Sequence, residues 1–453
     1  MKSKVVQSLL VFLVAGITIW GILMVMSVPA QAGEQRSPNQ VVTIAGQWSG
    51  VEQESFQAVL DEFTIQTGIP ISYTSYTFAD LKDLLLNCGA SGNCPDVAMV
   101  PFPGLISQLV DQGDLTPLES ILPDFNMYYT ATWRNLGSVG DTLYGVPFKA
   151  MTKSIIWYRP QAFQEITATV PMSWTALLNL NDALVANGQT PFSVGAESGG
   201  ASGWPLSDWL ENILVRAAGP DVDHQLVTHD IAWTNPRVVE SMQLFTDIFG
   251  RNDYQLGGIT GTLETNFFDA LFQVFTPTHD AAMYFEGTWV QAAIAAQFPE
   301  LIPVTDYNFF EFPEIDPQFG KPIVGAADFA VLFNDAADPQ TLIQFLATPD
   351  AAQIWVTLGG YLSPNLGVDL NSYPDELSRL QAELLMGAPD FLFDLDDQLP
   401  PELQVYVWNA LMDYVANPDQ LMTILQGIES EASRFQGPVH AVYLPTALKG
   451  SGR

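Results

Sequence analysis

The sequence predicts an α/β fold that continues into a helix-rich part. Strand and helix patterns alternate between residues 41 and 113, an extended run occupies residues 141–160, and several helix-start signals follow beyond residue 230. A strand–helix alternation of the first kind builds a parallel sheet whose two faces are covered by helices. The chain of 453 residues is long enough for two or three such compact parts.

The first part contains three short strand patterns, each followed by a helix pattern. The strands are predicted at residues 41–45, 70–74 and 96–100, where β-branched and apolar residues cluster. The helix after the first strand is indicated by apolar residues at helical spacing. Those positions are Phe56, Val59, Leu60 and Phe63. Helices are likewise expected at residues 80–86 and 105–110.

An extended segment follows at residues 141–160. A turn at Gly140-Asp141 leads into Tyr144-Gly-Val-Pro147, and the run ends in Ile155-Ile-Trp-Tyr158. Proline lacks the N–H that a central strand needs, so the chain changes direction or region near Pro147.

The later chain is richer in helix signals. Asn235-Pro236 combines an N-cap residue with proline at the first helical position. Residues 320–333 read as a strand in which Gly325 interrupts an apolar run. Residues 195–203 are a Gly/Ser-rich loop.

The N-terminus indicates export. Lys2 and Lys4 precede an apolar run, and Ala30-Gln-Ala32 offers a small-x-small cleavage site, so residues 1–32 are predicted to be a signal peptide. The alternative is an uncleaved anchor, because the apolar run is long enough to span a bilayer. We therefore expect a periplasmic or extracellular protein, with membrane tethering as the alternative.

The charge balance restricts the partners. Fifty acidic residues against sixteen Lys and Arg give a net charge of −34. Nucleic acids and other polyanions are poor partners for such a surface, because phosphate binding needs basic side chains. Neutral solutes fit best. A saline habitat is a further interpretation of the acidity that the sequence leaves open.

The two cysteines, Cys88 and Cys94, bracket a Gly/Ser/Asn loop. In an exported protein the simplest interpretation is a local disulfide bond, with two free thiols as the alternative. No histidine or second cysteine pair stands near them, so no metal site is expected there.

Taken in order, these segments resemble the extracellular sugar-binding proteins of ABC importers. The Tyr-Gly-Val-Pro and Trp-Tyr segment of residues 144–158, followed by Pro171-Met-Ser-Trp174, is similar to the first crossing between the two lobes of that family. The resemblance implies a two-lobed periplasmic-binding-protein fold, with lobes joined by crossing hinge strands and a C-terminal helical segment. The chain would return to the first lobe at residues 320–333 and cross again at Leu362-Ser-Pro-Asn365.

The implied domains follow these crossings. Lobe 1 is predicted to comprise residues 33–148 and 327–362, and lobe 2 residues 149–326 and 363–453.

Aromatic residues in loops are the first candidates for ligand contacts, because sugar binding uses flat apolar faces beside a few polar groups. Trp48 and Glu52 follow the first strand, at an edge where α/β sheets present ligands, although a simply buried Trp48 is equally compatible with the sequence. Trp204 and Trp209 follow the glycine loop.

A second group is similar to a recurrent family pattern, Met-x-x-x-Gly-x-Trp, at residues 283–289. The resemblance places Trp289 on the sugar, beside Glu286 and Gly287, whose missing side chain allows close approach. Trp408 matches a helix that contributes an aromatic residue in some relatives. Ordinary packing is the alternative for both tryptophans.

Two charged residues complete the candidates. Lys149 falls at the predicted first crossing and Asp328 on the return strand, so we expect these two residues to lie close together. Lys149 could donate to ligand hydroxyls or pair with a cleft carboxylate, whereas a solvated lysine is the alternative.

The predicted function is capture of a carbohydrate by hinge closure and its delivery to a membrane permease. Asp208-Trp-Leu-Glu-Asn212 and Arg216-Ala-Ala-Gly-Pro220 look most like the α-glucoside binders, which implies a di- or oligosaccharide. We expect a monomer without cofactor, metal or catalytic residues, since no diagnostic enzyme motif occurs. A secreted glycoside hydrolase or a binder of a non-sugar solute is the alternative.

Overall fold

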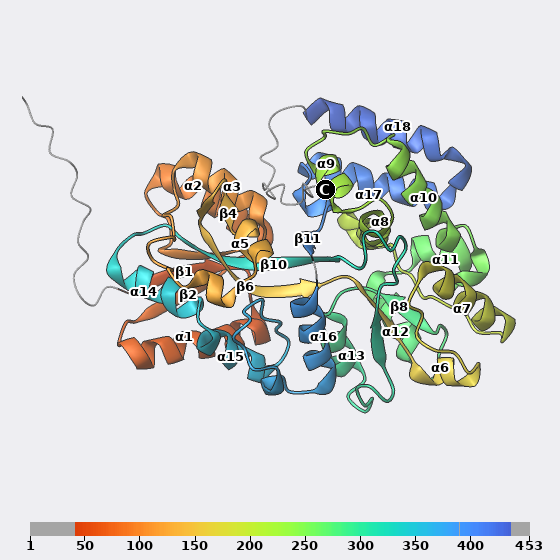
Figure 1. The fold of residues 1–453 in the computed structure, drawn as a ribbon, viewed down its shortest axis with the longest axis horizontal. Helices are drawn as coiled ribbons and strands as arrows, with labels where there is room; N and C mark the ends of the chain where they lie inside the picture. The colour runs from red at the N-terminus through yellow and green to blue at the C-terminus, as the bar shows by residue number, and fades with distance from the viewer. Residues whose placement is uncertain (1–40, 389, 436–453) are drawn as a thin grey trace, which may run out of the picture. The chain divides into compact units, whose positions relative to one another are not determined.

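The computed structural model describes residues 41–388 and 390–435 (Figure 1). The predicted signal peptide at residues 1–32 lies outside these residues. Within the described ranges, no helix combines the length and apolarity needed to cross a membrane.

Strands from both halves of the chain build a mixed six-stranded sheet, in the order β11-β10-β3-β1-β2 with β6 paired to β10. The strands are β1 (Val42–Gly46), β2 (Ile71–Ser75), β3 (Val97–Val100), β6 (Gly145–Thr152), β10 (Ile323–Leu332) and β11 (Phe391–Phe393). The three N-terminal strands are parallel, as predicted. The return strand β10 runs antiparallel to β3 and β6, which makes the sheet mixed.

Helices cover this sheet and connect its strands. They are α1 (Gly50–Thr67), α2 (Phe78–Ser91), α3 (Pro103–Gln112), α4 (Phe125–Tyr128), α5 (Ala131–Leu136), α14 (Ala337–Leu346), α15 (Pro349–Leu358) and α16 (Glu376–Gly387). The predicted stripe of α1 is buried at Phe56, Val59, Leu60 and Phe63. A short hairpin joins β4 (Ser138–Val139) to β5 (Thr142–Leu143).

The second part is mainly helical around a three-stranded antiparallel sheet. Its central strand is β7 (Ile155–Tyr158), flanked by β8 (Met283–Phe285) and β9 (Asn308–Glu311). The helices are α6 (Pro160–Glu165), α7 (Trp174–Ala186), α8 (Trp204–Ala217), α9 (Pro220–Val227), α10 (Pro236–Phe249), α11 (Gly258–Glu264), α12 (Phe267–Phe275), α13 (Val290–Gln297), α17 (Pro401–Ala416) and α18 (Leu421–Ala432). As predicted, Asn235 caps α10, its side chain accepting from the Arg237 amide.

The strands β6 and β10 cross between the two parts (Figure 1). Seven residue pairs hold them together, from Gly325 with Thr152 to Val331 with Gly145. The strands approach so closely at Gly325 that a Cβ atom there would lie 2.1 Å from the Met151 carbonyl oxygen. Glycine is therefore required for this pairing.

Two large hydrophobic cores divide the chain. One is built from residues 42–150 and 323–393, and the other from residues 156–312 and 395–432. Several side chains between Val368 and Phe393 pack in the first core, whereas residues 363–453 are predicted to belong to lobe 2. The pairing of β11 with β10 explains this difference, because it returns the chain to the first sheet once more.

The predicted disulfide bond between Cys88 and Cys94 is present. It joins the last turns of α2 to the segment that enters β3, and it closes a loop with a sequence separation of 6.

Candidate functional site

Two cavities flank the crossing strand β6 and both reach Met151. The first has a volume of about 450 Å³ and the second about 810 Å³. Each cavity is lined by residues from the chain segments of both hydrophobic cores, so each lies between the two lobes.

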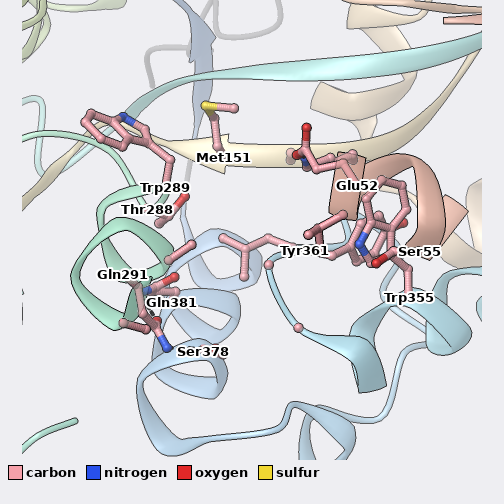
Figure 2. Close-up of a pocket in the computed structure, with 18 of the residues that line it drawn as sticks. Glu52, Ser55, Met151, Thr288, Trp289, Gln291, Trp355, Tyr361, Ser378 and Gln381 are labelled. Atoms are coloured by element: carbon pink, nitrogen blue, oxygen red, sulfur yellow. Dashed lines mark hydrogen bonds and ion pairs between the residues drawn. The ribbon is translucent and has the colours of Figure 1, made fainter. Parts of the chain in front are cut away.

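The first cavity is lined by residues from five separate segments, 51–55, 149–151, 288–295, 355–362 and 375–381. Figure 2 shows a close-up of it. Trp289 lies on one side of it, and Trp355 and Tyr361 lie on the opposite side (Figure 2). Polar side chains complete the wall. They are Glu52 and Ser55 from α1, Lys149 from β6, Thr288 and Gln291 from the start of α13, and Asp375, Ser378 and Gln381 from the start of α16. Aromatic faces with a few convergent polar groups are the usual composition of a small-molecule site.

Lys149 is the central charged group of the lobe 1 wall. Its ammonium donates to the Glu52 carboxylate, and it lies 5.2 Å from the ring centroid of Trp355 and 5.8 Å from that of Trp48. The lysine is only 7% exposed, whereas the Glu52 side chain is 49% exposed and remains available to a ligand. Lys149 is thus held by one carboxylate and two aromatic faces.

Asp328 lies opposite Lys149, as predicted. It is the register partner of Lys149 across β6 and β10, and it accepts from Gln47 Nε2 at 3.2 Å. Burial raises the pKa of Asp328 to about 6, and the nearby Lys149 opposes this rise. The predicted proximity of the two residues is confirmed.

The wall formed by α13 and the start of α16 carries a hydrogen-bond network. Gln291 Nε2 donates to both Asp375 carboxylate oxygens, at 2.9 and 3.0 Å, and Gln381 Nε2 donates to Gln291 Oε1 at 2.8 Å. Ser378 Oγ donates to Asp375 at 2.8 Å. These contacts tie α13 to α16 and fix the polar groups before a ligand arrives.

The second cavity is lined on one side by Phe102 and Gln108, and on the other by Lys153, Asp394 and Trp408. The Trp408 indole N–H donates to Asp396 at 2.5 Å, which holds the ring against the loop after β11.

Lys153 is surrounded by buried acidic side chains. Its ammonium lies 3.1 Å from Asp208 Oδ1 and 2.7 Å from Asp394 Oδ2, and 5.3 Å from the ring centroid of Trp204. Burial opposes the charged form, but Asp208 and Asp394 raise the pKa of Lys153 well above its usual value. Lys153 therefore stays protonated.

Three carboxyl groups cluster beside this single lysine. Asp208, Glu211 and Asp394 have carboxylate oxygens within 4.8 Å of one another, and all three are buried. Glu211 is already satisfied by the amides of Leu395 and Asp396. Because Lys153 contacts two of the three carboxylates, the cluster contains its own cation.

Glu286 belongs to the same buried group. It is fully buried, and burial raises its pKa to about 8, with Lys153 opposing the rise. Part of the acidic surplus is thus neutralised by protons at pH 7.

The ten sequence-predicted ligand residues separate into three sets. Glu52, Lys149 and Trp289 line the first cavity, and Trp408 lines the second. Trp48 and Asp328 lie behind Lys149, and Trp204 packs over Lys153. Gly287 supports Trp289, because a Cβ atom there would lie 3.0 Å from the Trp289 ring.

The remaining two predicted residues lie in the interior of lobe 2. Trp209 is 1% exposed and packs against the rings of Phe192, Phe249, Phe285 and Phe312. Glu286 is fully buried beside Asp208 and Lys153. Neither side chain lines the two cavities. Helix α8 is buried on all sides from Pro205 to Arg216, so Trp209 points into the interior of lobe 2.

Sequence reasoning missed several cavity residues, notably Trp355, Tyr361, Gln291 and Gln381. Trp355 lies in α15, where its spacing is that of an ordinary buried helix face. A possible signal was Gly359-Gly360-Tyr361 just before the predicted third crossing, because glycines allow a wall to approach a ligand.

Two lobes joined by crossing strands, with cavities between them, are the architecture of a solute-binding protein. The family model of bacterial extracellular solute-binding proteins matches residues 48–353, and the chain belongs to this family. It is accordingly a periplasmic or extracellular protein of the kind that serves ABC importers.

Individual relatives agree with this assignment. The osmoprotective compounds-binding protein GgtB of Synechocystis sp. is 35% identical over 382 residues, which cover 83% of this chain and 89% of the relative. The alpha-glucosides-binding periplasmic protein AglE of Rhizobium meliloti is 29% identical over 389 residues, covering 83% of each.

Solved structures share the fold at low sequence identity. The bacterial solute receptor AcbH has a TM-score of 0.77 at 19% identity, covering 87% of this chain and 98% of the receptor. The raffinose complex of RafE has a TM-score of 0.65 at 19% identity, covering 88% of this chain and 100% of RafE. The two-lobed fold predicted from the sequence is thereby confirmed.

Proposed function

We propose that the chain captures a neutral carbohydrate in the first cavity and delivers it to an ABC permease. The observation that carries this proposal is the composition of that cavity. Trp289 faces Trp355 and Tyr361 across the space, and amide, hydroxyl and carboxylate groups stand between them (Figure 2). Aromatic faces suit the CH side of a sugar ring, and the polar groups suit its hydroxyls.

The cavity size supports a ligand of one to a few sugar rings. Small-molecule sites commonly enclose about 300–1,000 Å³. The first cavity, at about 450 Å³, lies within this range.

The name of one curated relative favours a glycoside ligand. That relative is named for alpha-glucosides, whereas the other is named for osmoprotective compounds, a name that leaves their chemical class open. We propose an α-glucoside-type compound, with Glu52 and Lys149 of lobe 1 and Gln291 and Trp289 of lobe 2 as its main contacts.

Binding would proceed by hinge closure across β6 and β10. A ligand that contacts both cavity walls stabilises the closed arrangement over the open one. The closed, loaded protein would then be the form that a permease selects.

The test is thermal unfolding of the purified protein with a panel of mono-, di- and oligosaccharides, polyols and α- and β-glucosides. A ligand present at 100 times its Kd should stabilise the protein by about 2.7 kcal/mol. Chromatography of the sugars afterwards reports whether they stay intact.

A selective shift with an intact α-glucoside supports the proposal. Cleavage of the sugar would instead favour the hydrolase alternative. Stabilisation by a non-carbohydrate solute alone would contradict the proposed ligand class.

A further inference from the structure

An aromatic box in lobe 1 is occupied by a cation of the protein itself. The rings of Trp48 and Trp355 are almost perpendicular, at 89°, with centroids 4.8 Å apart. Tyr361 stacks on Trp355 at 5.0 Å and 24°. The ammonium of Lys149 lies within 6 Å of both tryptophan centroids.

Such a group of rings is the kind of surface that binds quaternary-ammonium compounds. Aromatic faces attract cations through the ring quadrupole, and the attraction is strongest where water is excluded. Both tryptophans are 1% exposed, so this box is well shielded from solvent. Trp355 also forms part of the first cavity wall, so the box borders the ligand space.

Two carboxyl groups make the box still more favourable to a cation. Glu52 pairs with Lys149 from the cavity side, and Asp328 is its register partner on β10. Lys149 balances these acids and fills the space in front of the rings.

We propose that Lys149 sets the charge class of the ligand: its ammonium occupies the Trp48–Trp355 box, so the cavity accepts neutral polyhydroxy solutes and rejects quaternary-ammonium osmolytes. This inference rests on the proposed function for the identity of the accepted ligand. The rejection of cations depends only on the geometry of Lys149. An external cation would meet the lysine charge at close range and find both ring faces taken.

The test compares the wild-type protein with Lys149→Ala, using choline and tetramethylammonium as probes in titration calorimetry. Removing the side chain exposes the rings and leaves Glu52 and Asp328 without their cation. We expect choline binding at least about tenfold tighter in Lys149→Ala than in the wild type.

Two control variants separate the box from general charge effects. Lys149→Arg keeps a cation at the rings and should stay insensitive to choline. Lys321→Ala also removes a lysine paired to a glutamate, Glu311, but Lys321 lines neither cavity, so this variant should resemble the wild type.

The proposal is overturned if a folded Lys149→Ala variant gains no affinity for choline. It is overturned equally if Lys321→Ala gains as much choline affinity as Lys149→Ala. It is also overturned if the wild-type protein itself binds choline as tightly as its best carbohydrate, a result that needs no variant to fold. A wild type that binds no carbohydrate contradicts the proposed function, while the choline titrations still decide the role of Lys149.

Discussion

Trp289 is the aromatic residue that lobe 2 contributes to the first cavity, and its ring is only partly buried. Replacing it with alanine should weaken carbohydrate binding by about 1–3 kcal/mol, because a stacking face is lost. Titration calorimetry with the ligand identified in the panel measures this loss. Trp289→Phe, which keeps a ring, should lie between the wild type and alanine.

Trp408 offers the matched comparison, because it lines the second cavity. If the ligand occupies the first cavity, Trp408→Ala should leave the affinity for a disaccharide nearly unchanged. A larger loss in Trp408→Ala than in Trp289→Ala would place the ligand in the second cavity instead.

The residues near the site differ in how far the sequence predicts them. Glu52 follows shortly after the first strand, Lys149 lies in the predicted crossing segment and Trp289 in a recognisable pattern. All three reach the first cavity. Trp355 and Gln381 come from ordinary helix faces, and only the folding of distant segments brings them to the same cavity. A spacing pattern contains no information about such long-range neighbours.

At the scale of elements, local patterns predict more. The first three strands and α1 follow from apolar spacing that nearby residues alone decide. The extra strand β11 has only three residues and was missed. Its position depends on pairing with β10, since Phe391 pairs with Ile323, 68 residues earlier in the chain.

The crossing of β6 and β10 yields a prediction at this scale. Gly325→Ala should destabilise the protein by about 2–4 kcal/mol, because the added Cβ atom would collide with the Met151 carbonyl. Urea unfolding measures the difference. Gly387→Ala is the control, since a Cβ atom there has nothing within 4 Å. Equal stability of the two variants would show that β6 and β10 can separate without cost.

At the scale of the whole molecule, some of the acidic side chains that outnumber the basic ones are buried in the interior. Burial raises the pKa of Glu286 from its usual 4.5 to about 8 and that of Asp223 from 3.8 to about 8. Between about pH 4.5 and 8, the folded protein therefore keeps protons that the unfolded chain has already released. Stability consequently falls as the pH rises through this range.

Glu286→Gln should flatten that decline. The variant cannot ionise at this position, so its stability should fall less from pH 5 to pH 8 than that of the wild type, by on the order of a few kcal/mol. Urea unfolding at both pH values measures the slope. The exposed Glu300→Gln is the control and should retain the wild-type slope. An unchanged slope in Glu286→Gln would mean that Glu286 is ionised in the folded protein throughout.

The discontinuous cores have a consequence for biosynthesis. The first core needs β10 and β11, which end at Phe393, and the second needs residues up to Ala432. Neither core can be completed before most of the chain has left the ribosome. The order of the segments along the chain thereby delays completion of both cores until late in synthesis.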